Sequence, residues 1–172
     1  MQLAVARAAE DVIVEVHRHG ERFDVRARAV VAALPAVAWQ VLTDYERLPR
    51  FIPGITKSVV RSRHGNRVLL DQSGEARFLL FTYPIAVQLD VVEWPPDWVA
   101  SRAIGGNVRR MNGRYELRPG PDRGSVLLLY YGEIELDFEL PPVVGSAAVR
   151  GTIEQQFTAM VAEVERRAAS SR

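Results

Sequence analysis

The sequence predicts one α+β domain, in which a long antiparallel sheet is followed by a single C-terminal helix. Three observations carry this prediction. Apolar–polar alternations separated by turn residues recur over residues 12–138, which is typical of an antiparallel sheet with one solvated face. A short helical pattern interrupts them within residues 35–52. Beyond residue 141, apolar residues recur every three or four positions, which indicates an amphipathic helix.

Length and composition set the class of protein. The chain has 172 residues, of which 48% are hydrophobic and 25% charged, and this suits one domain with a sizeable core. A formal net charge of +1 argues against a nucleic-acid partner. The absence of cysteine excludes disulfides, thiolate nucleophiles and cysteine-based metal sites. No apolar run reaches the roughly 18 residues that a membrane span requires.

The first elements are predicted to be two strands joined as a hairpin. They cover Val12–His17 and Phe23–Val30, and Gly20 between them supplies the permissive backbone of a tight turn. In the second strand, apolar residues alternate with charged ones, so one face is expected to be buried and the other wet.

The helical insert follows this hairpin. Pro35 can begin a helix, because its missing N–H would be unpaired there in any case. Four apolar residues then share one face at helical spacing: Ala38, Val41, Leu42 and Tyr45. Pro49 and Pro53 prevent one continuous helix, so we expect two short ones.

The long central segment reads as a meander of six strands. Their approximate bounds are 55–63, 67–81, 83–93, 98–104, 111–118 and 125–138. Turn-forming runs such as Trp94-Pro95-Pro96-Asp97 separate several of them. In the last strand Glu133, Glu135 and Asp137 alternate with apolar residues, which predicts that these carboxylates face solvent.

The final element is a helix from about Pro141-Pro142 to Ala169. Its apolar stripe consists of Val149, Ile153, Phe157, Met160 and Val164. Gly145 and Gly151 each cost about 1 kcal/mol relative to alanine inside a helix. We therefore expect close packing, a kink or a ligand to compensate at these positions.

Three sequence segments resemble one protein family. They are Leu42-Thr43-Asp44-Tyr45 through Pro53-Gly54-Ile55, then 110–119 (RMNGRYELRP), and Ile153-Glu154-Gln155-Gln156-Phe157. Together with the order of elements, they resemble the polyketide cyclase/dehydrase and coenzyme Q-binding group of the START-like superfamily. The resemblance implies a helix-grip fold: an antiparallel sheet wraps around the long C-terminal helix, with two short helices inserted after the N-terminal strands and a cavity between helix and sheet. We expect this domain to cover residues 11–170, after a disordered or trimmed segment at 1–10.

No catalytic or metal-binding motif stands out. His17, His19 and His64 are the only histidines, and two of them at i,i+2 spacing do not complete a zinc site. The nucleophile motif Gly-x-Ser-x-Gly does not occur. We therefore predict no catalytic residue, no metal and no cofactor.

Polar residues on otherwise apolar faces are the best candidates for a binding site. Gln72, Arg102, Tyr115 and Tyr130 have such positions, and a buried polar group without a hydrogen bond costs about 1–3 kcal/mol. A cavity containing water and a ligand head-group would satisfy them, whereas an edge strand or a bulge would turn Arg102 outward. The predicted ligand-binding residues are Phe51, Gln72, Phe78, Arg102, Tyr115, Tyr130, Phe157 and Met160.

The resemblance implies three functions that the residues do not separate. The favoured one is the binding and shielding or transport of a lipophilic small molecule, such as a lipid, a quinone or a polyketide-like compound. A cyclase, aromatase or dehydratase is the second, with Arg102, Tyr115 and Tyr130 as candidate groups. A protein-interaction module similar to the ribosome-association toxin is the third. The cytoplasm is the favoured location, although Ala6-Arg7-Ala8 resembles the tail of a signal-peptide cleavage site and leaves a periplasmic or secreted location open. The oligomeric state is not predicted.

Overall fold

The computed structural model describes residues 12–78 and 81–171, without the side chains of residues 78, 81 and 142–144. The predicted N-terminal segment 1–10 lies outside this range. The elements run in the order β1 (Ile13–His19), β2 (Arg22–Val31), α1 (Pro35–Leu42), η2 (Tyr45–Arg50), β3 (Ile55–His64), β4 (Arg67–Phe78), β5 (Phe81–Trp94), β6 (Trp98–Gly106), β7 (Val108–Pro119), β8 (Val126–Leu136) and α2 (Pro142–Ser170).

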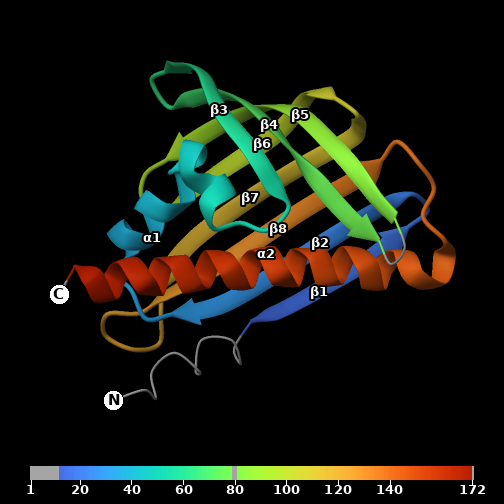
Figure 1. The fold of residues 1–172 in the computed structure, drawn as a ribbon. Coiled ribbons are helices and arrows are strands. Elements are labelled where there is room, and N and C mark those ends of the chain that lie inside the picture. The colour runs from blue at the N-terminus through green and yellow to red at the C-terminus, as the bar shows by residue number, and fades with distance from the viewer. Residues whose placement is uncertain (1–11, 79–80, 172) are drawn as a thin grey trace.

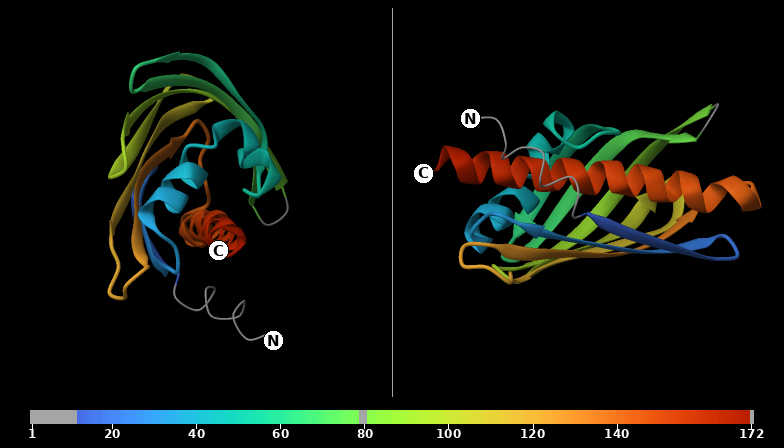
Figure 2. Two further views of the ribbon diagram at one scale, coloured as in Figure 1. Left: turned by 90° about the vertical axis from the view of Figure 1, so that its left-hand side faces the viewer. Right: turned by 90° about the horizontal axis from the view of Figure 1, so that it is seen from below.

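The strands form one antiparallel sheet of eight strands in the order β1-β2-β8-β7-β6-β5-β4-β3. The sheet curls, and α2 lies along its concave side (Figure 1). Figure 2 shows α2 end-on inside the curl, with α1 and η2 beside it. The α+β helix-grip prediction is confirmed. β7 begins at Val108, three residues earlier than the predicted 111–118, and its pairing with β8 is irregular between Val108 and Arg110.

The two short helices pack through the face that their sequence predicts. Ala38, Val41, Leu42 and Tyr45 are all buried. The second short helix, η2, is a 3₁₀ helix with Pro49 inside it. This tighter helix suits a short connecting segment that proline bars from continuing as an α-helix.

The C-terminal half of α2 packs tightly into the hydrophobic core. Phe157, Val161 and Val164 are each at most 1% exposed. They belong to the same core as Phe23 in β2 and Leu128 in β8. Such close packing leaves little internal space at this end.

The two glycines of α2 have different surroundings. A β-carbon at Gly145 would lie 3.0 Å from Arg18 Nη1 and 3.1 Å from the Leu140 β-carbon. The neighbouring atoms leave little room for a larger side chain, so close packing accounts for glycine at this position, as expected. A β-carbon at Gly151 would meet nothing within 4 Å, so this residue faces open space.

Candidate ligand-binding site

A partly open cavity of about 180 Å³ lies between α2 and the concave face of the sheet. Strands β4, β5, β7 and β8 supply one wall, and residues 149–156 of α2 supply the other. Its apolar lining consists of Ile55, Ala76, Ile85, Val87, Met111, Ile134, Leu136, Val149 and Ile153. Its polar lining residues are Gln72, Ser73, Glu75, Thr152 and Gln156.

A second hollow of about 430 Å³ adjoins this cavity and shares Gly54, Glu75 and Thr152 with it. Three small residues of α2 border the hollow: Ala147, Ala148 and Gly151. We call this adjoining hollow the mouth of the cavity.

The loop at Pro53-Gly54 closes over the boundary between mouth and cavity. Gln156 Nε2 donates a hydrogen bond to the Pro53 carbonyl at 2.9 Å, and the Glu75 amide donates to the Gly54 carbonyl at 2.8 Å. The backbones approach so closely that a β-carbon at Gly74 would lie 1.9 Å from the Gly54 carbonyl oxygen. Gly54 also has a φ of +84°, which favours glycine.

Gln72 is the predicted site residue that lines the cavity. Its Nε2 donates a hydrogen bond to Ser58 Oγ at 3.1 Å, which leaves its carbonyl oxygen available for other partners.

Phe157 and Met160 lie farther along α2, and neither belongs to the lining of the cavity. They are 1% and 4% exposed, respectively. The cavity therefore covers the N-terminal half of α2 rather than the whole apolar stripe of the helix. The predicted site residues Phe157 and Met160 therefore lie in the packed core and not on the wall of this cavity.

Tyr115 and Tyr130 face each other on the concave side of β7 and β8. Their ring centroids are 4.7 Å apart, and the Tyr115 ring is stacked on Phe157 at 6.4 Å. Burial raises the pKa of Tyr130 to about 12, and burial together with Tyr130 also raises the pKa of Tyr115. Both phenols therefore keep their protons at neutral pH.

Phe51 is not one of the residues that line the cavity. Phe51 packs at the edge of the core, under the Arg167 guanidinium, which lies 5.6 Å from its ring centroid. The side chain of Phe78 lies outside the described part of the structure.

Arg102 lies on the opposite, convex face of the sheet. Its side chain is 67% exposed and its Nη2 lies 3.7 Å from Asp90 Oδ2. The expectation that Arg102 faces the cavity is therefore wrong, and the alternative that turns it outward describes its position. The cause is the orientation of β6: Val99 is buried on the concave side, whereas Trp98 stacks with Trp94 at 6.2 Å on the convex side.

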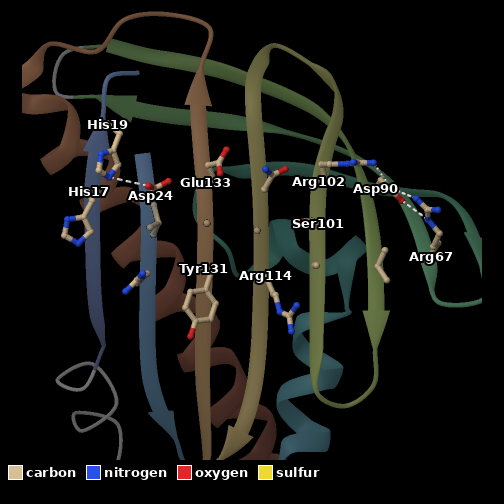
Figure 3. Close-up of a pocket in the computed structure, with 17 residues that line it drawn as sticks. His17, His19, Asp24, Arg67, Asp90, Ser101, Arg102, Arg114, Tyr131 and Glu133 are labelled. Carbon is tan, nitrogen blue, oxygen red and sulfur yellow. Dashed lines mark hydrogen bonds and ion pairs between the residues drawn. The ribbon is translucent and has the colours of Figure 1, made fainter. Parts of the chain in front are cut away.

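The convex face carries a wider hollow of about 780 Å³ (Figure 3). His17, His19 and Asp24 lie on one side of it, and Asp90, Arg102 and Arg67 on the other. Its polar side chains pair across strands: Arg67 Nη2 lies 2.5 Å from Asp90 Oδ2, and His19 Nε2 lies 3.5 Å from Asp24 Oδ2. This hollow is open and charged, so the cavity between α2 and the sheet is the better site for a lipophilic molecule.

Small residues on the concave face are the feature that sequence analysis missed. Ser101 and Ala103 alternate with larger outward residues in β6, and Gly113 pairs with Gly132 between β7 and β8. The two glycines leave room for the Tyr130 ring, which lies over them. The alternation of small residues in the sequence could have identified them.

The described residues were searched for a metal site and for a membrane-spanning helix. No group of three or more histidines, cysteines or carboxylates there could hold a metal ion. Among the described residues, no helix is long and apolar enough to cross a membrane.

Comparison with known proteins places the chain in a family. The family model described as "Polyketide cyclase / dehydrase and lipid transport" matches residues 31–161, which is well over half of the chain. A search of curated proteins finds no match.

Solved structures share the fold at low sequence identity. A STAR-related lipid transfer protein from Xanthomonas axonopodis has a TM-score of 0.70 and 14% identity, over 90% of this chain and 94% of its own. The Zhui aromatase/cyclase from Streptomyces sp. R1128 has a TM-score of 0.69 and 15% identity, over 86% and 94%. A START superfamily protein from Mycobacterium smegmatis has a TM-score of 0.62 and 18% identity, over 87% and 99%. With the match of the family model, the chain belongs to the polyketide cyclase/dehydrase and lipid transport family of START-like proteins.

Proposed function

We propose that this protein binds a lipophilic small molecule in the cavity between α2 and the sheet, and shields or carries it. The observation that supports this most is the lining of the cavity, which is mainly apolar and carries a few polar groups, of which Glu75 is charged. Burial of apolar surface contributes about 25 cal/mol per Å², and sparse polar groups orient the bound molecule. Lipids, quinones and polyketide-like compounds all fit this description.

The mouth gives the proposed ligand a route to the cavity. Its helical side includes three small residues, Ala147, Ala148 and Gly151, together with Thr152 and Gln155. The hydrogen bond from Gln156 to the Pro53 carbonyl holds the loop across the boundary. Breaking this bond would let the loop move away from α2, so passage needs a local change rather than opening of the sheet.

Binding without covalent chemistry is favoured by the titratable groups at the site. Glu75 is the only titratable side chain on the described cavity wall, and it lies 2.6 Å from Arg77 at the mouth. A general base works best with a pKa near the working pH. The pKa of Tyr130 is far above neutrality, so its phenol is poorly suited to take a proton.

Native mass spectrometry of gently purified protein tests the proposal directly. We expect an added mass that organic extraction releases as a lipophilic compound. The variant Ile153→Trp should lose that mass, because Ile153 lines the cavity and indole would occupy it. A folded wild-type protein with no bound compound, and with no affinity for any lipophilic probe, would refute the proposal.

Turnover distinguishes the enzymatic alternative from binding. The same preparation would be incubated with a reactive poly-β-keto substrate, and the products would be compared with those of spontaneous cyclisation. We expect the same products at the same rate. A changed product that disappears in Ile153→Trp would instead establish a cyclase.

A further inference from the structure

We propose that the Tyr130 hydroxyl is the hydrogen-bond donor at the inner end of the cavity, and that the site selects uncharged molecules with an acceptor oxygen, such as ketones or esters, over carboxylates. This inference rests on the proposed ligand-binding function and adds the chemical class of the ligand.

Tyr130 is not one of the residues that line the cavity, but the pairing of β7 with β8 places it close to that lining. Met111 pairs with Ile134, and both line the cavity. The next pair on the same face is Gly113 with Gly132, and the pair after that is Tyr115 with Tyr130. The tyrosine pair thus lies one glycine pair beyond the cavity wall.

The Tyr130 ring leans across this glycine pair. A β-carbon at Gly132 would lie 2.7 Å from the Tyr130 hydroxyl oxygen, and one at Gly113 would lie 3.1 Å from it. The phenol therefore extends from its own position back toward Met111 and Ile134, in the direction of the cavity. The two glycines are what leave room for it.

The hydroxyl has no hydrogen-bond partner among the residues that the structure describes. Among the described residues, no hydrogen bond reaches the hydroxyl of Tyr130 or of Tyr115. Both tyrosines are partly buried, and neither hydroxyl oxygen is among the fully enclosed, unpaired polar atoms of the described residues. A buried hydroxyl gains a hydrogen bond when an acceptor enters. Because burial raises the pKa of Tyr130 to about 12, the group stays protonated and donates.

The cavity offers nothing that would neutralise an anion. No arginine, lysine or histidine is part of its described lining, and the one charged side chain there is the carboxylate of Glu75. A ligand carboxylate would lose its hydration without gaining a cation. A ketone or ester loses far less hydration and accepts the phenol hydrogen bond.

Three naphthalene derivatives of similar shape test this selectivity: 2-acetylnaphthalene, 2-ethylnaphthalene and 2-naphthoate. Their dissociation constants would be measured by calorimetric titration at neutral pH. We expect the ketone to bind about three- to tenfold more tightly than the hydrocarbon, as one net hydrogen bond provides. The carboxylate should bind at least about tenfold more weakly than the ketone.

Tyrosine-to-phenylalanine variants identify the donor. In Tyr130→Phe the preference for the ketone over the hydrocarbon should fall below about twofold, while affinity for the hydrocarbon is retained. Tyr131→Phe is the matched control, because Tyr131 is the next residue on β8 and is 43% exposed on the convex face. It should keep the wild-type preference.

The outcomes separate this inference from the proposed function. If wild-type protein bound the ketone and the hydrocarbon with equal affinity, the inference would be overturned, but the proposed ligand-binding function would stand. Tight binding of 2-naphthoate would have the same consequence. Retention of the ketone preference in Tyr130→Phe would also overturn the role of Tyr130. If none of the three compounds binds folded wild-type protein, both proposals fail. The wild-type comparison decides the ligand class even if a variant does not fold.

Discussion

Ile153 and Met160 lie on one stripe of α2, about two turns apart, but only Ile153 borders the cavity. Met160 is 4% exposed within the packed core. The same substitution should therefore have opposite consequences at the two positions, since one side chain has space beside it and the other has none.

Met160→Trp is expected to reduce stability rather than binding. Overpacking of a filled core costs about 1–3 kcal/mol, so the melting temperature should fall. Titration with a hydrophobic fluorescent probe should give an affinity close to that of wild type. Ile153→Trp is the matched comparison and should lose probe binding with little change in melting temperature. An unchanged melting temperature with lost probe binding in Met160→Trp would show that the cavity extends over this position.

Tyr45 carries a buried hydrogen bond between η2 and the sheet. Its hydroxyl donates to Glu93 Oε1 at 2.7 Å, while Arg63 Nη1 donates to Glu93 Oε2 at 2.8 Å. Tyr45→Phe would leave one oxygen of a buried carboxylate without this donor, and we expect a loss of about 1–3 kcal/mol in urea unfolding. Tyr131→Phe on the convex face should change stability by no more than about 0.5 kcal/mol. Equal stabilities of the two variants would contradict this role of Tyr45.

At the scale of elements, the end of α2 is tied to the start of η2 by ion pairs. Arg167 Nη2 lies 2.8 Å from Asp44 Oδ2, and Arg167 Nε lies 2.6 Å from Glu163 Oε1. Arg166 Nε lies 2.7 Å from the other oxygen of Glu163. Hydrogen bonds from Arg166 and Arg167 lower the pKa of Glu163 to about 2.

This lowered pKa predicts an acid-sensitive contribution to stability. Because the pKa of Glu163 is lower in the folded chain than its ordinary value of 4.5, ionised Glu163 stabilises the fold fully above that value. The contribution is lost as the pH falls toward about 2. We expect the difference in unfolding free energy between wild type and Glu163→Gln to shrink over this range. A difference that stays constant with pH would argue against the ion pairs as its source.

The glycines of α2 give a prediction about helix stability. Gly151→Ala should stabilise the protein by about 1 kcal/mol, because alanine has the higher helix propensity and its methyl group meets open space. Gly145→Ala should gain less or lose stability, since the methyl group would press on the Leu140 β-carbon at 3.1 Å. Both variants would be compared by chemical denaturation. Equal stabilisation at the two positions would show that local packing does not oppose the methyl group at Gly145.

At the scale of the whole molecule, the cavity lies where α2 and the concave face of the sheet do not pack closely against each other. The described core fills the end where Phe157 stacks on Tyr115 and leaves space beside Val149 and Ile153. Occupancy of that space should stabilise the whole fold, since a ligand that binds only the folded state adds to its stability. At 2-acetylnaphthalene concentrations about 100 times its dissociation constant, the expected gain is about 2.7 kcal/mol. Ile153→Trp should show no such gain, and a gain that persists in this variant would place the compound elsewhere.

Much of the architecture was determined by the sequence itself. Alternation along residues 12–138 identified the strands, proline placed the break between α1 and η2, and the apolar stripe identified α2. These are local properties of the chain, because they depend on the period with which side chains meet a surface. The family resemblance that rests on them is confirmed by the family model over residues 31–161.

Tertiary structure decided which face of each strand is concave and where the space lies. In β6, alternation groups Trp98 with Arg102 but does not show that this group faces outward, and the stacking of Trp98 on Trp94 is a contact between strands. Along α2, one apolar stripe contains both cavity wall and solid core, and the partner residues on the sheet separate them. Likewise, Gly113 and Gly132 make room for the Tyr130 ring only because the pairing of β7 with β8 brings the two glycines together. The period of a sequence determines which residues share a face, whereas the space beside that face depends on the volumes of residues brought together from distant parts of the chain.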